Sequence, residues 1–563
     1  MLRPVDPGVV PEATAVLAWR VHPRGTDEMR VRDALGPLFV DEDFLDERFA
    51  GMFPGLGRPG LSPGLLAMVT VLQFLHNLSD REAVAAVADR ISWKYALGLE
   101  LTDTGFDASV LSEFRARLAA PGCADGLLDT VLDKLKAAGL VRAGGRARTD
   151  STHVIAAVRA LHRIELVGEM LRAALEEIAS VNENWILPLL DAGWHERYGR
   201  RVELARLLGR GSRKTTAAKL SAQIGADGRA LLAAIDADRA AGWINLLPRV
   251  QLLRIVWDQQ FQTGDNGTLV LKDVPDLPAS AGRIRSPYDT DARYAAKGRA
   301  EQDDLEWTGT KAHLTESCDH DLPRLITDVH TTPATDQDVT ATTAIQNKLT
   351  GRALAPAIHL MDAGYPSAAN LAASAQAGIT LLAPLTASPG RNPHSGTFTP
   401  YDFQIDWHTG TARCPNGATS RSMRPEARGL VIFAFSRSHC TDCPIRARCT
   451  PAAPPTARRI TVHPEPLHQA RLAAHQAQNT PGWQNTYNQR AGIEATISQA
   501  VRGPDLRHAR YRGLAKAHVQ NIATGIALNI TRLGAHYNTT PTTPRPPTRI
   551  HHLCTTHGIT KTT

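Results

Sequence analysis

Apolar residues recur at helical spacing near both ends of the chain and in one long stretch between them. Near the N-terminus, Ser62 followed by Pro63 predicts one helix start, and Ser79 with Glu82 forms a capping box that predicts a second. A third helix is predicted over Ser109–Leu118. Helical spacing returns between residues 161 and 282 and again in the apolar positions from Leu514 to Leu533, where it predicts a last amphipathic helix.

Strand-like runs occupy the regions between these helices, and two of them end at an aspartate. One run leads from Arg146 to Asp150, where the strand is expected to close. The other leads from Ala357 to Asp362, after which glycine and proline break the chain. A short helix over 367–378 and a further strand from Ile379 then complete a βαβ unit, which places Asp362 at the carboxyl end of a parallel strand.

A single helix is predicted from Pro481 to Arg502, between a Thr-Pro start and a Gly-Pro stop. Tyr487, Arg490 and Glu494 are spaced three and four residues apart, so they share one face of this helix. On spacing alone, this face is better explained as a solvated surface with an Arg490–Glu494 ion pair. The function of this helix therefore has to be inferred from other segments of the chain.

Composition changes the picture in two ways. The chain has 563 residues, which is too long for one ordinary core, and its net charge of +7 favours a polyanionic partner, although mild basicity also serves solubility. The first residues lack a signal peptide, and the longest apolar run, Leu65 to Leu75, is too short to cross a membrane. We therefore expect a cytoplasmic protein of a bacterium, without a membrane partner.

Four of the seven cysteines, Cys414, Cys440, Cys443 and Cys449, fall in one stretch. A pair two residues apart can chelate one ion, and two further thiolates would complete a structural zinc site. Because a second tight pair is missing, four reduced structural thiols explain the spacing as well.

The densest basic run of the chain follows the predicted helix and supplies candidate contacts to a polyanionic partner. These are Arg502, Arg507, Arg510, Arg512 and Lys516. From Asn538 the chain is rich in threonine and proline, so we expect residues 538–563 to form a disordered tail.

The DST at Asp150, the DAGY at Asp362 and the Tyr487-x2-Arg490-x3-Glu494 pattern, in this order, resemble the DDE transposases of bacterial insertion sequences. The resemblance is to the IS4/IS5-like superfamily and is strongest to its IS1182 branch. In one departure, Val501 stands where the usual signature has a lysine, with Arg502 beside it.

The resemblance implies an α/β fold with a ribonuclease-H-like core. That core would be built from residues 140–160, 283–388 and 471–537, and interrupted by a helical insertion at 161–282 and a small Cys-containing, β-rich insertion at 389–470. An all-helical N-terminal domain, residues 1–125, would bind DNA ends or dimerise.

The resemblance also implies the chemistry. Asp150, Asp362 and Glu494 would hold two Mg2+ ions, which Mn2+ can replace, about 3.5–4 Å apart. Tyr487 and Arg490 would contact the DNA backbone, and a homodimer would cut double-stranded DNA at the element's ends and join the 3′ hydroxyls to target DNA. Two alternatives remain open, namely a metal-dependent nuclease without strand transfer and an inactive DNA-binding descendant.

Overall fold

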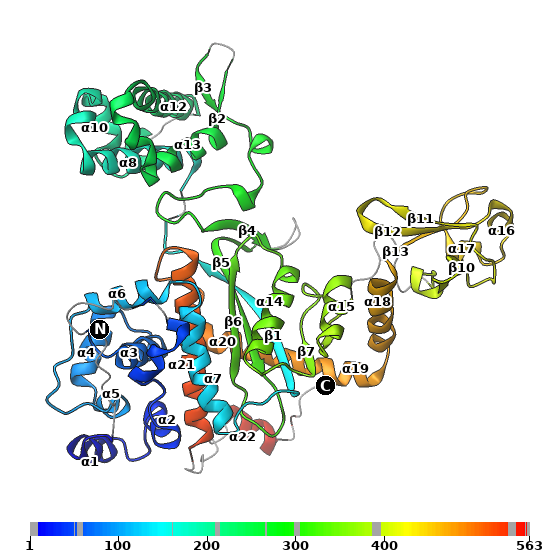
Figure 1. The fold of residues 1–563 in the computed structure, drawn as a ribbon, viewed down its shortest axis with the longest axis horizontal. Coiled ribbons are helices and arrows are strands. Elements are labelled where there is room, and N and C mark those ends of the chain that lie inside the picture. The colour runs from blue at the N-terminus through cyan, green and yellow to red at the C-terminus, as the bar shows by residue number, and fades with distance from the viewer. Residues whose placement is uncertain are drawn as a thin grey trace.

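The computed structural model describes residues 9–49, 51–52, 60–159, 161–208, 214–264, 267–297, 305–385, 396–538, 548–557 and 559. A mixed sheet lies at the centre, the N-terminal helices pack on one side of it, and two further parts project outward (Figure 1). Among the described residues no helix is long and apolar enough to cross a membrane.

The central sheet contains both antiparallel and parallel pairs of strands. Its members are β1 (Arg146–Ile155), β4 (Arg293–Lys297), β5 (Leu305–Ser317), β6 (Ile326–Pro333), β7 (Ile358–Leu360) and β8 (Thr380–Leu382). The order across the sheet is β6-β5-β1-β7-β8. Strand β4 pairs with residues 305–309 of β5, next to the part of β5 that pairs with β6. Strand β5 is antiparallel to β1 and β6, whereas β1, β7 and β8 run parallel.

The predicted βαβ unit is confirmed. Helix α15 (Ala368–Gln376) connects β7 to β8, its first turn is capped by the Ser367 side chain, and Gly378 after it has a φ of +73°. Strand β1, by contrast, does not close on Asp150. It continues to Ile155 because further β-branched residues pair with β5 as far as Gly309.

Within its described residues the N-terminal region contains seven α-helices, and the predicted starts at Ser62 and Ser79 are confirmed by their side-chain caps. They are α1 (Glu12–Val21), α2 (Asp27–Leu35), α3 (Pro63–Leu75), α4 (Asp80–Asp89), α5 (Ile91–Leu97), α6 (Ser109–Leu118) and α7 (Cys123–Ala137). Helix α14 (Asp338–Gly351) follows β6. Helix α21 (Leu514–His536) lies between the N-terminal helices and β6, so it is buried on nearly every side rather than amphipathic. One hydrophobic core therefore joins the N-terminal helices to the sheet.

The segment between β1 and β4 is helical, as predicted, and has a hydrophobic core of its own. It contains α8 (Arg163–Val181), α9 (Glu183–Ile186), α10 (Ala192–Tyr198), α11 (Leu204–Leu208), α12 (Lys214–Ala237), α13 (Pro248–Gln260), β2 (Phe261–Thr263) and β3 (Leu269–Leu271). In Figure 1 it projects at the upper left.

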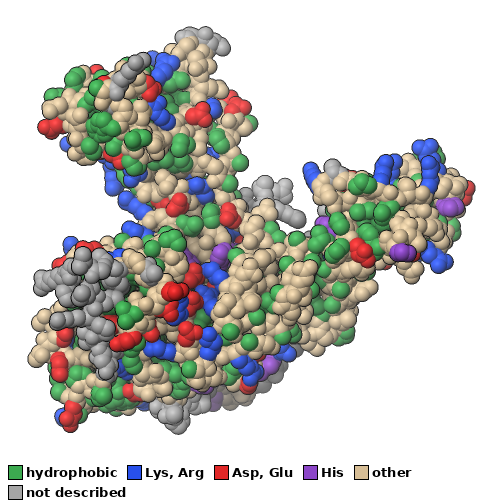
Figure 2. Space-filling view, in the orientation of Figure 1, with side chains coloured by type: hydrophobic (Ala, Val, Ile, Leu, Met, Phe, Trp, Pro, Cys, Tyr) green, Lys and Arg blue, Asp and Glu red, His purple; other side chains and the backbone are tan. Residues whose placement is uncertain are grey.

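The cysteine-containing segment forms a small lobe with its own apolar cluster. It consists of β9 (Gln404–Asp406), β10 (Thr411–Arg413), β11 (Ser422–Glu426), β12 (Leu430–Ala434), α16 (Arg437–Thr441), α17 (Arg446–Cys449) and β13 (Arg459–Val462). Figure 2 shows basic side chains along the outer side of this lobe, and Arg421, Arg424 and Arg437 are among its exposed residues. Helix α18 (Glu465–Gln478) connects the lobe to the rest of the chain.

The helical segment predicted over 481–502 has the expected ends, but its middle differs from a regular α-helix. Helix α19 (Pro481–Tyr487) and helix α20 (Gly492–Arg502) are separated by a 3-10 turn, Asn488–Ala491. The Arg148 guanidinium contacts this turn, because it donates a hydrogen bond of 2.5 Å to the Gln489 carbonyl, which also accepts the backbone N–H of Gly492.

The expected tail also differs from the prediction in part. Residues Arg549–Thr556 form helix α22, none of whose residues is buried. Residues 539–547, 558 and 560–563 lie outside the described part of the chain.

Candidate active site

Two of the three predicted carboxylates meet at one edge of the sheet. Strand β7 pairs with the first part of β1 and ends at Leu360, so Asp362 follows it close to Asp150. Burial raises the pKa of Asp150, and the negative charge of Asp362 adds to this rise. Each carboxylate is oriented by a backbone N–H at 2.8 Å, Asp150 by that of Ser151 and Asp362 by that of Gly364.

The third predicted carboxylate is connected to this pair through Arg490. A guanidinium nitrogen of Arg490 lies 3.6 Å from Asp150 Oδ2, and the other lies 3.5 Å from Glu494 Oε1. The side chain of Glu494 is 69% exposed, whereas those of Arg490 and Asp150 are 16% and 15% exposed. A cation thus lies between a carboxylate of the sheet and a carboxylate of α20.

Tyr487 lies on the same side of the site. Its ring stacks on Trp483 with 4.7 Å between centroids and 17° between planes. Burial raises the pKa of the Tyr487 phenol, the Arg490 guanidinium opposes this rise and the Asp362 carboxylate adds to it. The phenol, the guanidinium and the aspartates therefore form one electrostatic unit.

The donor set suits a hard divalent ion, because it consists of carboxylate oxygens converging from strand ends and a helix. The bridging guanidinium shows that the space between Asp150 and Glu494 accepts a cation. As the side chains stand, the described residues contain no group of three or more His, Cys, Asp or Glu arranged to hold a metal ion.

A buried ion network fixes α20 on the sheet, and sequence reasoning missed it. Arg148 pairs with Glu316 at 2.6 Å, and their side chains are 4% and 0% exposed. The second oxygen of Glu316 accepts a hydrogen bond from Thr496 of α20 and pairs with Arg532 of α21. The available signal was that Arg148 and Glu316, which are paired across β1 and β5, have opposite charges.

The contact between α20 and Arg148 of β1 also requires a glycine. A Cβ on Gly492 would lie 2.0 Å from a guanidinium nitrogen of Arg148, whose position is fixed by Glu316. Glycine at this position lets the first turn of α20 approach β1 closely.

The structure separates the predicted basic contacts into two kinds. Arg502, Arg507, Arg512 and Lys516 are exposed. Arg510 instead donates hydrogen bonds to the Asn77 side chain and the Leu78 carbonyl, and its guanidinium lies over the Phe74 ring. Arg510 therefore ties the C-terminal segment to the turn between α3 and α4, and is not free to bind a phosphate in this arrangement.

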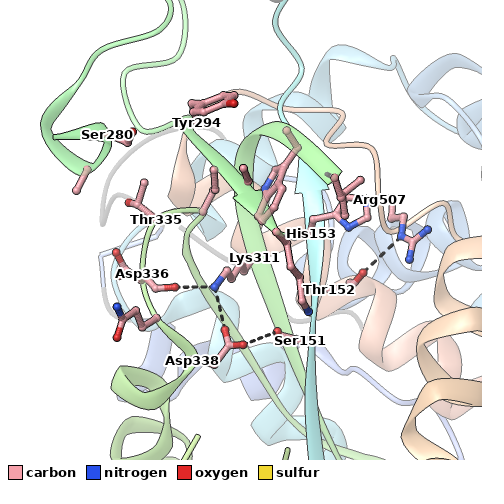
Figure 3. Close-up of a pocket in the computed structure, with 18 residues that line it drawn as sticks. Ser151, Thr152, His153, Ser280, Tyr294, Lys311, Thr335, Asp336, Asp338 and Arg507 are labelled. Carbon is pink, nitrogen blue, oxygen red and sulfur yellow. Dashed lines mark hydrogen bonds and ion pairs between the residues drawn. The ribbon is translucent and has the colours of Figure 1, made fainter. Parts of the chain in front are cut away.

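A cavity of about 740 Å³ opens along β1 immediately beyond Asp150. Figure 3 shows Ser151, Thr152 and His153 on one wall, with Lys311, Asp338 and Arg507 near them. Lys311 pairs with Asp338 at 3.0 Å, and the other oxygen of Asp338 accepts a hydrogen bond from Ser151 at 3.2 Å. Polar and charged side chains thus line the part of the cavity that lies against β1.

The four clustered cysteines are free thiols, and Cys414, Cys440 and Cys449 pack against the lobe's apolar cluster. Burial raises the pKa of Cys449, Arg458 opposes the rise, and the charges of the other three thiols add to it. In the described part of the chain they do not form a group that would hold an ion as placed, so structural zinc stays a prediction.

Comparison with known proteins adds two family matches. Residues 413–534 match the family described as Transposase DDE domain, and residues 29–117 match that described as Transposase domain (DUF772). Tyr487, Arg490 and Glu494 lie inside the first match, whereas Asp150 and Asp362 lie outside both.

One curated relative is the "Uncharacterized protein ORF8 in nfe locus" of Rhizobium meliloti. It is 30% identical over 79 residues, which cover 14% of this chain and 38% of that protein. The chain therefore spans well under half the length of this relative. No solved structure matches the chain.

Proposed function

We propose that the chain is a DDE transposase with the IS1182-type architecture and that it cuts and joins DNA, because a match to a transposase DDE domain follows a match to an N-terminal transposase domain along it. In this proposal it binds the terminal inverted repeats of a bacterial insertion sequence, cleaves at the element's ends and joins the 3′ hydroxyls to target DNA. A homodimer would carry the two ends.

The observation that carries the proposal is the meeting of Asp150 and Asp362 at the sheet edge, with Arg490 connecting them to Glu494. The strand order β6-β5-β1-β7-β8, with its three antiparallel and three parallel members sharing β1, supports a ribonuclease-H-like core. This arrangement supports the proposal of a DDE site at these residues.

In the proposed mechanism, Asp150, Asp362 and Glu494 hold Mg2+ or Mn2+. The bound ions would activate the attacking oxygen and stabilise the leaving oxygen of an in-line displacement at phosphorus. Arg490 has the planar donor fork that suits two phosphate oxygens, and Tyr487 beside it can donate a hydrogen bond to the same backbone.

The exposed cations near the site would extend this contact along DNA. Arg502 lies at the end of α20, and Arg507 lines the cavity beside Asp150. Arg502 would also replace the lysine that is absent at Val501. Arg512 and Lys516 continue the basic surface, which would add a salt-dependent share of affinity.

The experiment uses DNA that carries the inverted repeats flanking the gene. Asp150→Asn, Asp362→Asn and Glu494→Gln should each lower cleavage by about 10³-fold or more while end binding persists. Asp321→Asn removes an exposed carboxylate from the loop between β5 and β6 and should leave cleavage unchanged. Cleavage that survives one of the first three changes rejects that residue's role.

The same assay separates the alternatives. Joined products show a transposase, whereas cleavage without joining shows a nuclease. End binding without either reaction, in the presence of Mg2+ or Mn2+, would indicate a DNA-binding descendant.

A further inference from the structure

Arg490 occupies the space that the proposed mechanism gives to a metal ion. Its two terminal nitrogens face Asp150 Oδ2 and Glu494 Oε1 at 3.6 and 3.5 Å, so one guanidinium balances both carboxylates. A divalent ion held by the same two oxygens would lie within about 2–2.6 Å of each, which leaves no room for the guanidinium.

We infer that Arg490 excludes the divalent ion from the DNA-free protein, and that a phosphate of bound DNA draws the guanidinium away and admits the ion. This inference rests on the proposed function, because it concerns the order in which that site takes DNA and metal. Arg490 thereby acts as the residue that couples DNA binding to metal binding.

The contacts of Arg490 allow its guanidinium to move away from the two carboxylates. Charge-assisted hydrogen bonds to carboxylates are typically about 2.7–2.9 Å long, so its two ion pairs are loose. Its Nε is buried and has no hydrogen-bond partner among the residues that the structure describes. A phosphate could engage two donors of the guanidinium at once and would be a better partner than the present carboxylates.

Arg148 shows the opposite arrangement within the same joint. It is 4% exposed and makes contacts of 2.5–2.6 Å with Gln489 and Glu316, so it is fixed from both sides. The two arginines approach the 3-10 turn with different functions, Arg148 holding the turn and Arg490 neutralising the carboxylates beside it.

The electrostatics of the site agree with this assignment. Burial and the charge of Asp362 both raise the pKa of Asp150, and the Arg490 guanidinium lowers it. In the DNA-free protein, the bridging guanidinium thus supplies positive charge that the ions would supply in the working complex. By linkage, DNA should raise metal affinity by the same factor as metal raises DNA affinity.

The test measures Mn2+ binding to the full chain without DNA, by the electron paramagnetic resonance signal of free Mn2+. Arg490→Gln removes the charge and should bind Mn2+ about tenfold or more tightly than the wild type, since a unit charge about 4 Å away contributes several kcal/mol in a protein site. Adding Glu494→Gln to this variant should cancel the gain. Arg490→Met, a second neutral replacement, should reproduce it if the glutamine variant folds poorly.

Arg502→Gln is the matched control, because it removes the same charge from the exposed end of α20. It should change Mn2+ affinity by less than about twofold, since its charge is screened by water. Equal Mn2+ affinity in the wild type and the two Arg490 variants, or an equal gain in the Arg502 control, would overturn the inference.

Failure of the inference and failure of the proposed function are distinguishable. Equal Mn2+ affinities together with cleavage that depends on the three carboxylates would reject only the exclusion of metal by Arg490. A gain in Mn2+ affinity in a protein that neither cuts nor joins DNA would reject only the proposed function.

Discussion

The two sides of the candidate site are built differently. On the sheet side, Asp150 and Asp362 follow from strand pairing, and each is oriented by a backbone N–H. On the helix side, Glu494 lies on the exposed face of α20, and its carboxylate meets Arg490 rather than either aspartate. Strand order is sufficient to bring the first pair together, whereas the third carboxylate depends on how a helix is joined to the sheet.

The largest expected effect comes from removing that joint. Arg148→Ala would leave Glu316 buried and deprive it of a partner at 2.6 Å, although Arg532 still contacts it. Breaking a buried ion pair from one side typically costs about 3–5 kcal/mol. We expect a loss of this size in the free energy of unfolding of the sheet core, measured by urea denaturation.

Arg142→Ala provides the control for this change. Arg142 also pairs with an acidic side chain, Asp321, at 2.9 Å, but the two side chains are 53% and 59% exposed. An exposed pair contributes about 0–1 kcal/mol. Similar losses of unfolding free energy in the two variants would contradict the view that the buried contacts of Arg148 hold α20 on the sheet.

A second prediction tests the close approach of α20 to β1. Gly492→Ala would place a Cβ 2.0 Å from the fixed guanidinium of Arg148, and overpacking of this kind costs about 1–3 kcal/mol. Because the helix must shift to relieve the contact, Glu494 should also move, and we expect DNA cleavage to fall more than end binding. Urea denaturation and the cleavage assay measure the two effects.

Gly482→Ala is matched to it, since Gly482 lies in α19 and a Cβ there would meet no atom within 4 Å. Alanine in a helix is favoured over glycine by about 1 kcal/mol, so this variant should be as stable as the wild type or more so. A destabilised Gly482 variant would show that flexibility of the segment, and not contact with Arg148, requires its glycines.

The local part of this architecture could be predicted from the sequence, and the long-range part could not. The helix starts at Ser62, Ser79 and Ser367 depend on side chains that cap their own first turn. The 3-10 turn between α19 and α20 instead contacts Arg148, which is remote in sequence and donates a hydrogen bond to the Gln489 carbonyl. The hydrophobic periodicity of residues 481–502 contains no signal of a contact with Arg148.

The candidate site divides in the same way. The sequence predicted that Asp362 lies at the end of a strand, because glycine and proline break the chain directly after it. The arrangement of Arg490 between two carboxylates could not be predicted, since the spacing of Arg490 and Glu494 is also that of an ordinary surface ion pair. Which partner the arginine acquires is decided by the sheet.

The smallest expected effect concerns the chain after α20, where the contrast between fixed and exposed groups continues. Arg510 contacts Asn77 and Leu78, so Arg510→Ala should lower stability by about 1 kcal/mol and leave the salt dependence of DNA binding unchanged. Lys516→Ala removes an exposed cation and should leave stability unchanged while reducing the slope of log affinity against log salt by about 1. Titration of labelled end DNA between low and moderate salt, together with urea denaturation, measures both quantities. A shallower slope for Arg510→Ala at unchanged stability would place this arginine on DNA and would show that its contact with the α3–α4 turn opens in the complex.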